Sequence, residues 1–306
     1  MKRRKFIELA GLACGSAVIS GCGGGPAPST GERSAVTAKK DRGRVFVGNN
    51  ENPAAALKAA VAAAGGLGFI PSGSHVVLKP NVAWSRTPQQ AANTDPRILT
   101  AMIEMCREAG AKKITVFEHT IDRPAAQVLA ISGIGAAARD AGADLVYGAS
   151  ERDFAPIEIK KGKLMTRDTL ARTILDADVL INMPKAKQHS QTGLTLGLKN
   201  MMGMNFDRQA WHSGPDLHQY IADYATAVPV AMTVMDASRI LLTNGPKGPG
   251  KTRDPHEVIV SFDPVAVDAY ACGLFGLAPS AVGYVVKAGE LGLGESDPDK
   301  ITVERV

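Results

Sequence analysis

Asn182-Met-Pro-Lys-Ala-Lys-Gln-His-Ser-Gln-Thr-Gly-Leu-Thr-Leu-Gly-Leu-Lys-Asn-Met-Met-Gly203 is the stretch around which this chain is organised. The apolar run 179–181 leads into it and predicts a buried parallel strand, because strands covered on both faces are continuously apolar. Pro184 is expected to end that strand, since proline has no N–H to donate to a ladder. Polar side chains therefore follow directly after the end of this predicted strand.

The residues after the proline carry the first candidate functional groups. If the chain stays extended, Lys185, Lys187 and His189 project to one side, because side chains alternate with a period of two. Apolar residues then recur at helical spacing over 194–203, which predicts a helix that carries Lys199 and Asn200 at its far end.

Strands and helices alternate along most of the remaining chain. This order predicts an α/β fold, with a mainly parallel sheet and helices on both faces. A small hairpin insertion is expected over 157–165, around Lys161-Gly162. We expect residues 44–306 to form a single α/β domain. The other predicted strands are 44–47, 75–78, 114–117, 144–147, 230–235, 258–262 and 301–304, and the predicted helices include 53–64, 133–141, 169–175, 217–225 and 279–291.

The amino-terminal residues resemble a targeting signal and are not expected to be part of the folded domain. Lys2-Arg3-Arg4-Lys5-Phe6-Ile7 precedes the apolar stretch 9–20, a pattern typical of a twin-arginine export signal. Cys22 closes a sequence that resembles a lipobox, so we expect it to be lipidated. The alternative is an N-terminal helix or ordinary membrane anchor, but the apolar run is shorter than the roughly 20 residues that span a bilayer.

These motifs give an organisation of three parts: a signal over 1–21, a flexible tether over 22–43 rich in Gly, Pro and Ser, and the domain. The expected location is periplasmic or at the cell envelope, with the chain held in a membrane through Cys22.

Charge and cysteine content exclude several classes of function. Four Lys and Arg and one Glu in 1–21 account for +3 of the formal net charge of +5, which leaves +2 for the rest. A nucleic-acid partner is therefore not expected. Beyond the signal and Cys22 only Cys106 and Cys272 remain. Because no CxxC occurs, no iron–sulfur cluster is expected. Both thiols lie in apolar helical patterns and are predicted to be buried, with a disulfide as the alternative.

Four predicted strand exits carry ionisable or amide side chains. In open parallel sheets, ligands bind beyond the carboxyl ends of the strands, so we expect a shared site there. The groups are Lys79 and Asn81, Glu118 and His119, Lys185 with Lys187 and His189, and Asp236.

Several lysines in one cleft would repel each other unless an anion occupied it. A phosphate, sulfate or carboxylate is the natural complement, and a small anionic ligand is the predicted partner. Burial and like charge would also lower a lysine's pKa, which would make it a candidate general base or carbonyl-capturing amine. The alternative is that Lys185, Lys187 and Lys199 are solvated surface charges.

A metal site is a second candidate. His189, His212, His218 and Asp236 supply the nitrogen and oxygen ligands that suit zinc, nickel or iron. The spacing from His212 to His218 matches no standard signature, and each histidine could equally be a hydrogen-bonded loop residue. No other cofactor is assigned from the sequence, and a bound metal stays one of the alternatives.

The order of motifs resembles the domain of unknown function 362 family. The resemblance spans 45–306 and lies in Lys79-Pro-Asn81, Asn182 to His189, Leu194 to Gly203, Phe262-Asp-Pro-Val-Ala-Val-Asp268 and Ala288-Gly-Glu-Leu-Gly-Leu-Gly294. Some members of the family carry an appended ferredoxin-like module, but its cysteines are absent here. The family often has a larger residue at Ala186. The signature positions that the resemblance implies are Lys79, Asn81, Lys185, Lys187, His189, Lys199, Asn200, Asp236, Asp263 and Asp268.

The sequence predicts an exported lipoprotein that acts as an enzyme on a small anion. The class of reaction is not assigned. Lys185 and Lys199 would clamp the anion, His189 would exchange protons, and Asp236 would orient a base or hold a metal. Asp263 is expected to cap a helix instead. The alternatives are a non-catalytic ligand-binding or assembly lipoprotein and a metal or cofactor-binding redox-associated protein. The further ligand-binding candidates are Lys79, Asn81, Lys187, Asn200 and Asp268.

Overall fold

The structure is a computed structural model that describes residues 42–306. The predicted export signal over 1–21, the lipidation site Cys22 and the tether up to residue 41 lie outside the described residues. Over residues 42–306, every helix is too short or too polar to cross a bilayer.

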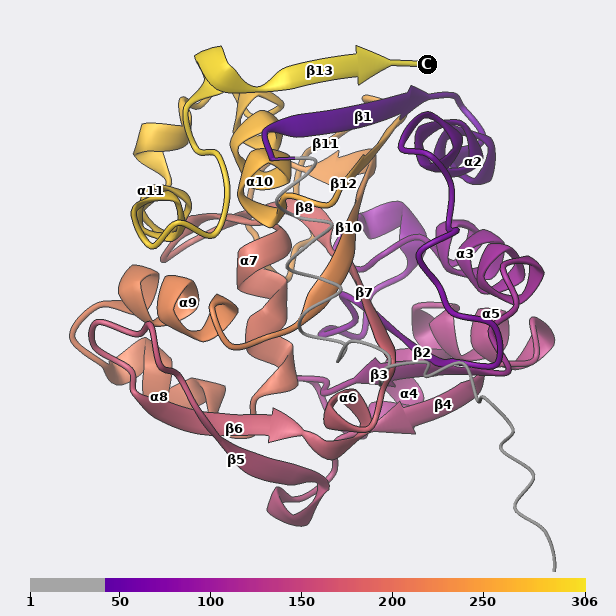
Figure 1. The fold of residues 1–306 in the computed structure, drawn as a ribbon, viewed down its shortest axis with the longest axis horizontal. Helices are drawn as coiled ribbons and strands as arrows, with labels where there is room; N and C mark the ends of the chain where they lie inside the picture. The colour runs from indigo at the N-terminus through magenta and orange to yellow at the C-terminus, as the bar shows by residue number, and fades with distance from the viewer. Residues whose placement is uncertain (1–41) are drawn as a thin grey trace, which may run out of the picture.

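A large sheet runs through the middle of the molecule (Figure 1). Its main path has the order β13-β1-β12-β10-β7-β2-β3-β4, in which β12 alone runs opposite to the others. The mainly parallel α/β fold predicted from the sequence is confirmed. The strands on this path are β1 (Arg44–Asn49), β2 (His75–Pro80), β3 (Lys113–Glu118), β4 (Asp144–Tyr147), β7 (Val179–Met183), β10 (Val230–Leu241), β12 (Glu257–Ser261) and β13 (Thr302–Arg305).

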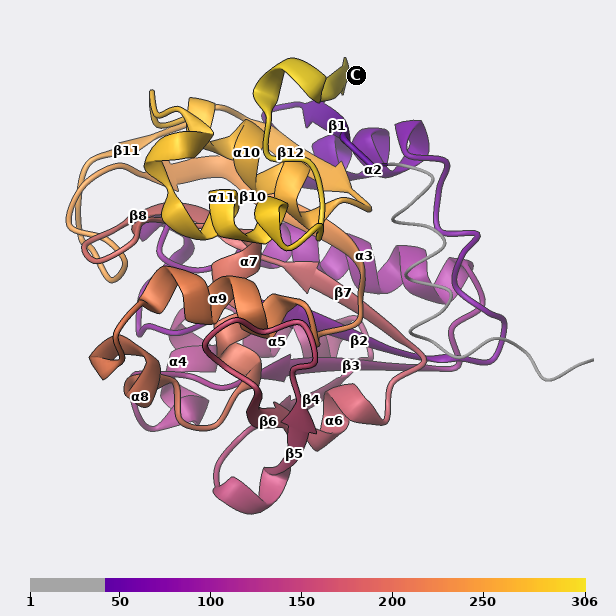
Figure 2. The same ribbon diagram turned by 60° about the vertical axis from the view of Figure 1, so that its left-hand side comes forward.

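Helices cover both faces of this sheet, as Figures 1 and 2 show. Alternate side chains of each strand enter different cores, so Val76 and Leu78 pack on one face and Val77 on the other. The first face is covered by α2 (Pro53–Ala63), α3 (Pro96–Glu108), α4 (Ala125–Ile131) and α5 (Ile134–Asp140), and the second by α7 (Gly197–Asn200), α9 (Leu217–Ala225), α10 (Pro264–Gly273) and α11 (Gly283–Glu290).

The predicted hairpin exists around the expected turn at Lys161-Gly162, but it extends further in both directions than residues 157–165. It is a separate two-stranded sheet of β5 (Phe154–Glu158) and β6 (Arg167–Ala171), at the lower edge of Figure 1. The predicted helix 169–175 was therefore wrong over its first half, because residues up to Ala171 pair with β5, and only α6 (Arg172–Leu175) is helical. Pairing across the hairpin overrides local helical spacing here.

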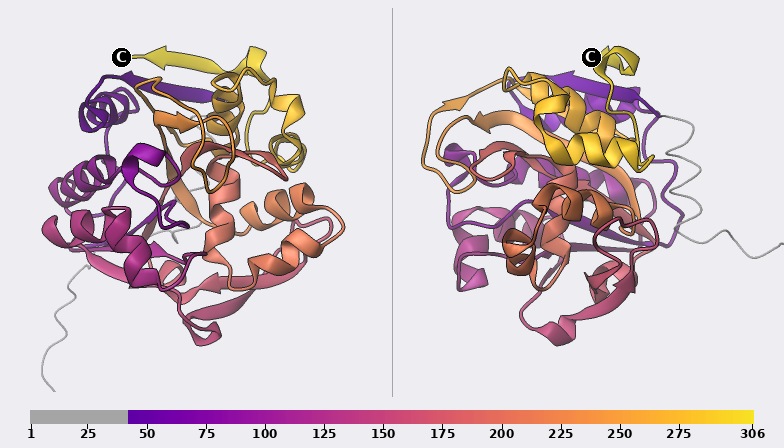
Figure 3. Two further views of the ribbon diagram at one scale, coloured as in Figure 1. Left: turned by 180° about the vertical axis from the view of Figure 1, so that it is seen from behind. Right: turned by 90° about the vertical axis from the view of Figure 1, so that its left-hand side faces the viewer.

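The organising stretch continues its strand past the proline. Beyond Pro184, β8 (Lys185–His189) pairs with the same strand β10 that accompanies β7. Strand β10 is longer than predicted, so Asp236 lies within it, opposite Lys185, and not at its exit. The predicted helix 194–203 is also replaced in part, by β9 (Gly193–Thr195), α7 and a 3-10 turn over Met201–Met204. Figure 3 shows β8 and α7 from behind and from the side.

Candidate functional site

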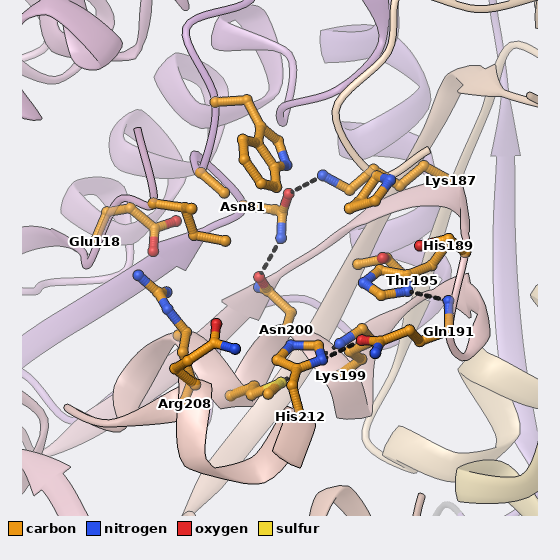
Figure 4. Close-up of a pocket in the computed structure, with 18 of the residues that line it drawn as sticks. Asn81, Glu118, Lys187, His189, Gln191, Thr195, Lys199, Asn200, Arg208 and His212 are labelled. Atoms are coloured by element: carbon orange, nitrogen blue, oxygen red, sulfur yellow. Dashed lines mark hydrogen bonds between the residues drawn. The ribbon is translucent and has the colours of Figure 1, made fainter. Parts of the chain in front are cut away.

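A cavity of about 330 Å³ lies beyond the carboxyl ends of β2, β3 and β7 (Figure 4). This is the edge where parallel sheets of this kind bind ligands, and the volume suits a small molecule. Its polar lining comes from β2, β3, β8, β9, α7 and α8 (Arg208–Ser213) and from the loops that follow β2 and β8. Its apolar lining includes Trp84, Ile121, Met202 and Pro246.

The amine of Lys79 has a carboxylate partner within the protein, Glu118. Its Nζ atom donates to Oε1 of Glu118 at 2.7 Å and to the Pro80 carbonyl at 2.8 Å, and its side chain is 1% exposed. Strand register places Lys79 beside Asn182, on the face that carries α7. There Asn200 accepts from Lys79 at 3.3 Å. Burial lowers the pKa of Lys79, while Glu118 acts in the opposite direction.

Asn81 links two of the lysine-bearing segments. Its side-chain oxygen accepts from Nζ of Lys187 at 2.7 Å, and its nitrogen donates to Oδ1 of Asn200 at 2.8 Å. Lys187 also donates to the Ala92 carbonyl at 2.5 Å. Burial lowers the pKa of Lys187 to about 7. The charge of Glu118 acts against this shift, and the neighbouring lysines add to it.

Lys199 differs from these lysines in having almost no partner. Its side chain is 6% exposed, yet within residues 42–306 its Nζ atom makes one polar contact, to Sδ of Met202 at 3.4 Å. A thioether is a weak acceptor, so the three donors of an ammonium group are not satisfied. Burial first, and the charge of Arg208 second, lower the pKa of Lys199 to about 7.

Positive charge exceeds negative charge around the cavity. Glu118 is the one acidic residue among the described residues of its lining, and it is already bound by Lys79 and by the N–H groups of Val82 and His119. Arg208 donates to the Thr120 carbonyl at 2.9 Å, and burial lowers the pKa of its guanidinium to about 10. A bound anion would compensate this surplus.

Two stacked imidazoles form one wall (Figure 4). The ring centroids of His189 and His212 lie 6.1 Å apart with planes 9° from parallel. Burial is the largest cause that lowers the pKa of each, to about 2 for His189 and about 4 for His212, and Lys199 is the next cause in both. Both rings are therefore neutral near pH 7.

Hydrogen bonds assign different tautomers to the two rings. Nδ1 of His189 accepts N–H groups from Gln191 at 3.1 Å and Thr192 at 3.4 Å, which leaves the ring proton on Nε2. Nδ1 of His212 contacts the side-chain oxygen of Gln191, which can only accept, so Nδ1 carries that proton and Nε2 is free to accept. One ring can donate a hydrogen bond through Nε2, and the other can accept one.

Thr195 adds a hydroxyl group without a partner. It lines the cavity, is 4% exposed, and its Oγ1 atom has no hydrogen bond within the described part of the chain. Buried polar groups are normally paired, so this oxygen is available to a ligand.

Lys185 and Asp236 lie outside the cavity. Nζ of Lys185 donates to Oδ2 of Asp236 at 2.8 Å in a fully buried ion pair. Asp236 also accepts from the N–H groups of Asp95 and Ser238 and from the Ser238 hydroxyl. The structure therefore does not bring these two residues together with Lys199 and His189.

The four residues of the candidate metal site do not converge either. His218 accepts the N–H of Tyr284 at 3.1 Å and stacks on its ring, and Asp236 is occupied by Lys185. Over residues 42–306, the His, Cys, Asp and Glu side chains form no group of three or more that could hold a metal ion. These residues do not fit a resident metal.

Asp268 and Asp263 bind backbone groups. Asp268 accepts from the N–H groups of Gly197 at 2.7 Å and Leu198 at 2.9 Å, so it fixes the start of α7 and does not line the cavity. Burial raises its pKa to about 8, against the effect of those two donors. Asp263 accepts from two N–H groups in the first turn of α10, as expected of a cap.

The site thus unites Lys79, Asn81, Lys187, His189, Lys199, Asn200 and His212, all of which were predicted as candidates. Thr195 and Arg208 were missed, because a single hydroxyl group within the stretch Leu194 to Gly203 and a single arginine outside the quoted motifs give no spacing signal of their own. Glu118 was expected among the strand-exit groups of a shared site, but no role was predicted for it. Its ion pair with Lys79 forms because β2 and β3 are neighbouring parallel strands that end at the same edge of the sheet.

The fold and sequence have known relatives. A thylakoid-associated protein of Synechocystis sp. is 27% identical over 253 residues, which cover 78% of this chain and 75% of that protein. The lactate racemase apoprotein from Thermoanaerobacterium thermosaccharolyticum aligns with a TM-score of 0.52 at 10% identity, over 78% of this chain and 57% of the racemase chain. That likeness concerns the fold alone.

A further solved structure, of a protein from Thermotoga maritima, has a TM-score of 0.43 at 13% identity over 74% of this chain and 60% of its own. The model of the family described as "Domain of unknown function (DUF362)" matches residues 76–273, which contain every polar side chain of the cavity. The chain therefore belongs to the DUF362 family.

Proposed function

We propose that the protein binds a small anion, a phosphate, sulfate or carboxylate, in this cavity and acts on it as an enzyme. The observation that carries the proposal is the surplus of buried positive charge. Lys187, Lys199 and Arg208 line one cavity whose single acidic residue among those described, Glu118, is bound by Lys79. Like charges are held together at a cost, which an anionic ligand removes.

The hydrogen-bond donors and acceptors of the cavity support separate roles for its residues in anion binding and in proton transfer. Lys199 and Arg208 have no carboxylate partner within residues 42–306, so they are free to bind the anion, while Asn81 positions Lys187 beside them. His189 offers an Nε2–H hydrogen-bond donor and His212 an Nε2 acceptor, so His212 can take up and return a proton at a ligand that His189 helps to hold. That pairing favours an enzyme over a passive binding protein.

Thermal denaturation with anions tests this function. Phosphate, sulfate, acetate and lactate would be titrated against the wild type, Lys199→Met, Arg208→Met and the surface control Lys161→Met. We expect at least one anion to raise the Tm of the wild type and of the control, and to do so much less in the two cavity variants, because ligand binding to the folded state adds stability.

Two outcomes would overturn the proposal. The first is an absence of stabilisation by any of the four anions at concentrations up to tens of millimolar. The second is stabilisation that is equal in the wild type and in both cavity variants, which would place the anion elsewhere.

We also propose that the chain is exported by the twin-arginine route and anchored through a lipid on Cys22, which places it in the periplasm or cell envelope. The support is Arg3-Arg4, the apolar stretch 9–20 and the position of Cys22. We expect Cys22→Ser to abolish incorporation of labelled fatty acid and Arg3→Lys with Arg4→Lys to retain the protein in the cytoplasm. Unchanged labelling or unchanged export would overturn the respective step.

A further inference from the structure

The lysines of this region differ in how completely their amines are bonded. Lys79 and Lys185 each have a carboxylate partner, and Lys187 has two oxygen acceptors. Lys199 is buried to a similar degree, but among the described residues the one polar contact of its amine is to a thioether sulfur. The first three amines are therefore structural or binding cations, and the Lys199 amine is left available for chemistry.

The surroundings of Lys199 favour its neutral form. A buried ammonium without acceptors is costly, and deprotonation removes that cost. The pKa of about 7 follows from burial and from the positive charge of Arg208. A neutral lysine amine is a nucleophile, and its usual partner in proteins is a carbonyl carbon.

The geometry points to Lys199 as a carbonyl-capturing nucleophile, which binds anionic aldehydes or ketones such as 2-oxo acids as an imine. This inference rests on the proposed function, since Lys187 and Arg208 would bind the anionic end of the same molecule. It narrows the substrate class from small anions to those that carry a carbonyl group next to the charge.

The step balances without an outside oxidant or reductant. The lone pair of Nζ adds to the carbonyl carbon and forms an N–C bond, while the carbonyl π pair moves to oxygen. The nitrogen loses two protons and the oxygen leaves as water with two, so that one C–O bond is broken and a C=N bond is made. Nε2 of His212 can accept each proton from nitrogen in turn and pass it to oxygen, while Nε2–H of His189 donates a hydrogen bond to that oxygen.

Reductive trapping tests the inference. Folded protein would be incubated at pH 7 with glyoxylate or pyruvate and cyanoborohydride, then digested and mapped by mass spectrometry. We expect Lys199 to be alkylated about tenfold faster or more than exposed Lys161, because a pKa near 7 leaves a far larger neutral fraction than the usual value of about 10.4. Saturating pyruvate, added before glyoxylate, should slow labelling at Lys199 only.

The variants make the result specific. Lys199→Arg keeps the positive charge but should lose the fast adduct, with its fold checked by circular dichroism, and Lys161→Met should retain it. Acetaldehyde, which carries no charge, should label Lys199 more slowly than glyoxylate does.

Labelling that spreads evenly over surface lysines, or falls on Lys187 instead, would overturn the inference. If anions stabilise the wild type but no adduct forms at Lys199, the imine is excluded and anion binding stands. If neither occurs, both proposals fail.

Discussion

At the scale of single residues, the partner of a lysine and not its burial decides what it can do. Lys79, Lys185, Lys187 and Lys199 are all at most 6% exposed. A lysine–carboxylate pair inside a protein offsets desolvation by a short charged hydrogen bond, whereas the part of the chain that the structure describes offers Lys199 no such compensation. The sequence could not separate them, because their carboxylate partners are distant in the chain.

Lys185→Met should reveal a structural role. It leaves Asp236 buried without its cation, so we expect the free energy of unfolding to fall by about 3–5 kcal/mol in urea denaturation. Anion affinity of the folded protein should be unchanged. The control Lys113→Met removes an exposed ion pair with Asp144 and should cost at most about 1 kcal/mol. A loss of anion affinity in Lys185→Met would place Lys185 in the site.

Anion binding should weaken as pH rises. Lys187 and Lys199 have pKa values lowered to about 7, so above that pH both lose the proton that makes them cations. We expect affinity to fall by about tenfold or more between pH 6.5 and pH 9, measured by calorimetry. Lys199→Arg should show a smaller fall because guanidinium stays protonated. An affinity that is flat across this range would contradict the assignment of these amines to the ligand.

At the scale of elements, the site depends on how closely α7 approaches the sheet. Asn200 on α7 reaches Asn81, Lys79 and Asn182, and Asp268 of α10 fixes the start of this short helix. Gly197 makes the approach possible, since a Cβ atom there would lie 2.8 Å from Oδ1 of Asp268. Four residues cannot hold a helix by propensity, so packing and the cap do so.

Gly197→Ala should therefore disturb both stability and the cavity. The added methyl group would press on Asp268 and on Thr233, 3.2 Å away, and overpacking of this kind costs about 1–3 kcal/mol. Gly273→Ala is the matched control, because nothing lies within 4 Å of its would-be Cβ atom and the residue ends α10. Urea denaturation measures both, and equal stability of the two variants would contradict the tight contact.

Elements with a clear apolar pattern in the sequence were predictable, whereas elements whose structure depends on a neighbouring strand were not. Val76 to Leu78 alternate between two cores as their apolar pattern indicates. Residues 169–171 have helical spacing but join β6 because β5 is beside them. Asp236 was expected at a strand exit, yet β8 supplies a further neighbour that prolongs β10 past it. The residues of the site were largely predictable, but their division between cavity and buried ion pair depended on this extra pairing.

At the scale of the whole molecule, the sheet divides the interior into two separate cores. Cys106 lies in one and Cys272 in the other, both fully buried and free. Burial raises the pKa of each thiol to about 12. The disulfide that the sequence left open is therefore absent between these two described cysteines.

Thiol reactivity should follow global unfolding. Neither Cys106 nor Cys272 should react with a thiol reagent in the folded protein, and both should react in denaturant, because a protonated thiol shielded on all sides is unreactive. Labelling at increasing urea, read by mass spectrometry, would show the two rates rising together. Fast labelling of one cysteine in native buffer would contradict a single cooperative unit.

The direction of β1 also has a consequence for orientation. It runs the same way as β7, so Arg44 starts at the rim opposite the cavity, and Gly43 is tied there to Asp263. A lipid attached ahead of Arg42 would therefore join the domain on the side away from the cavity. The point of attachment would not obstruct the cavity entrance, so that dissolved anions could reach it.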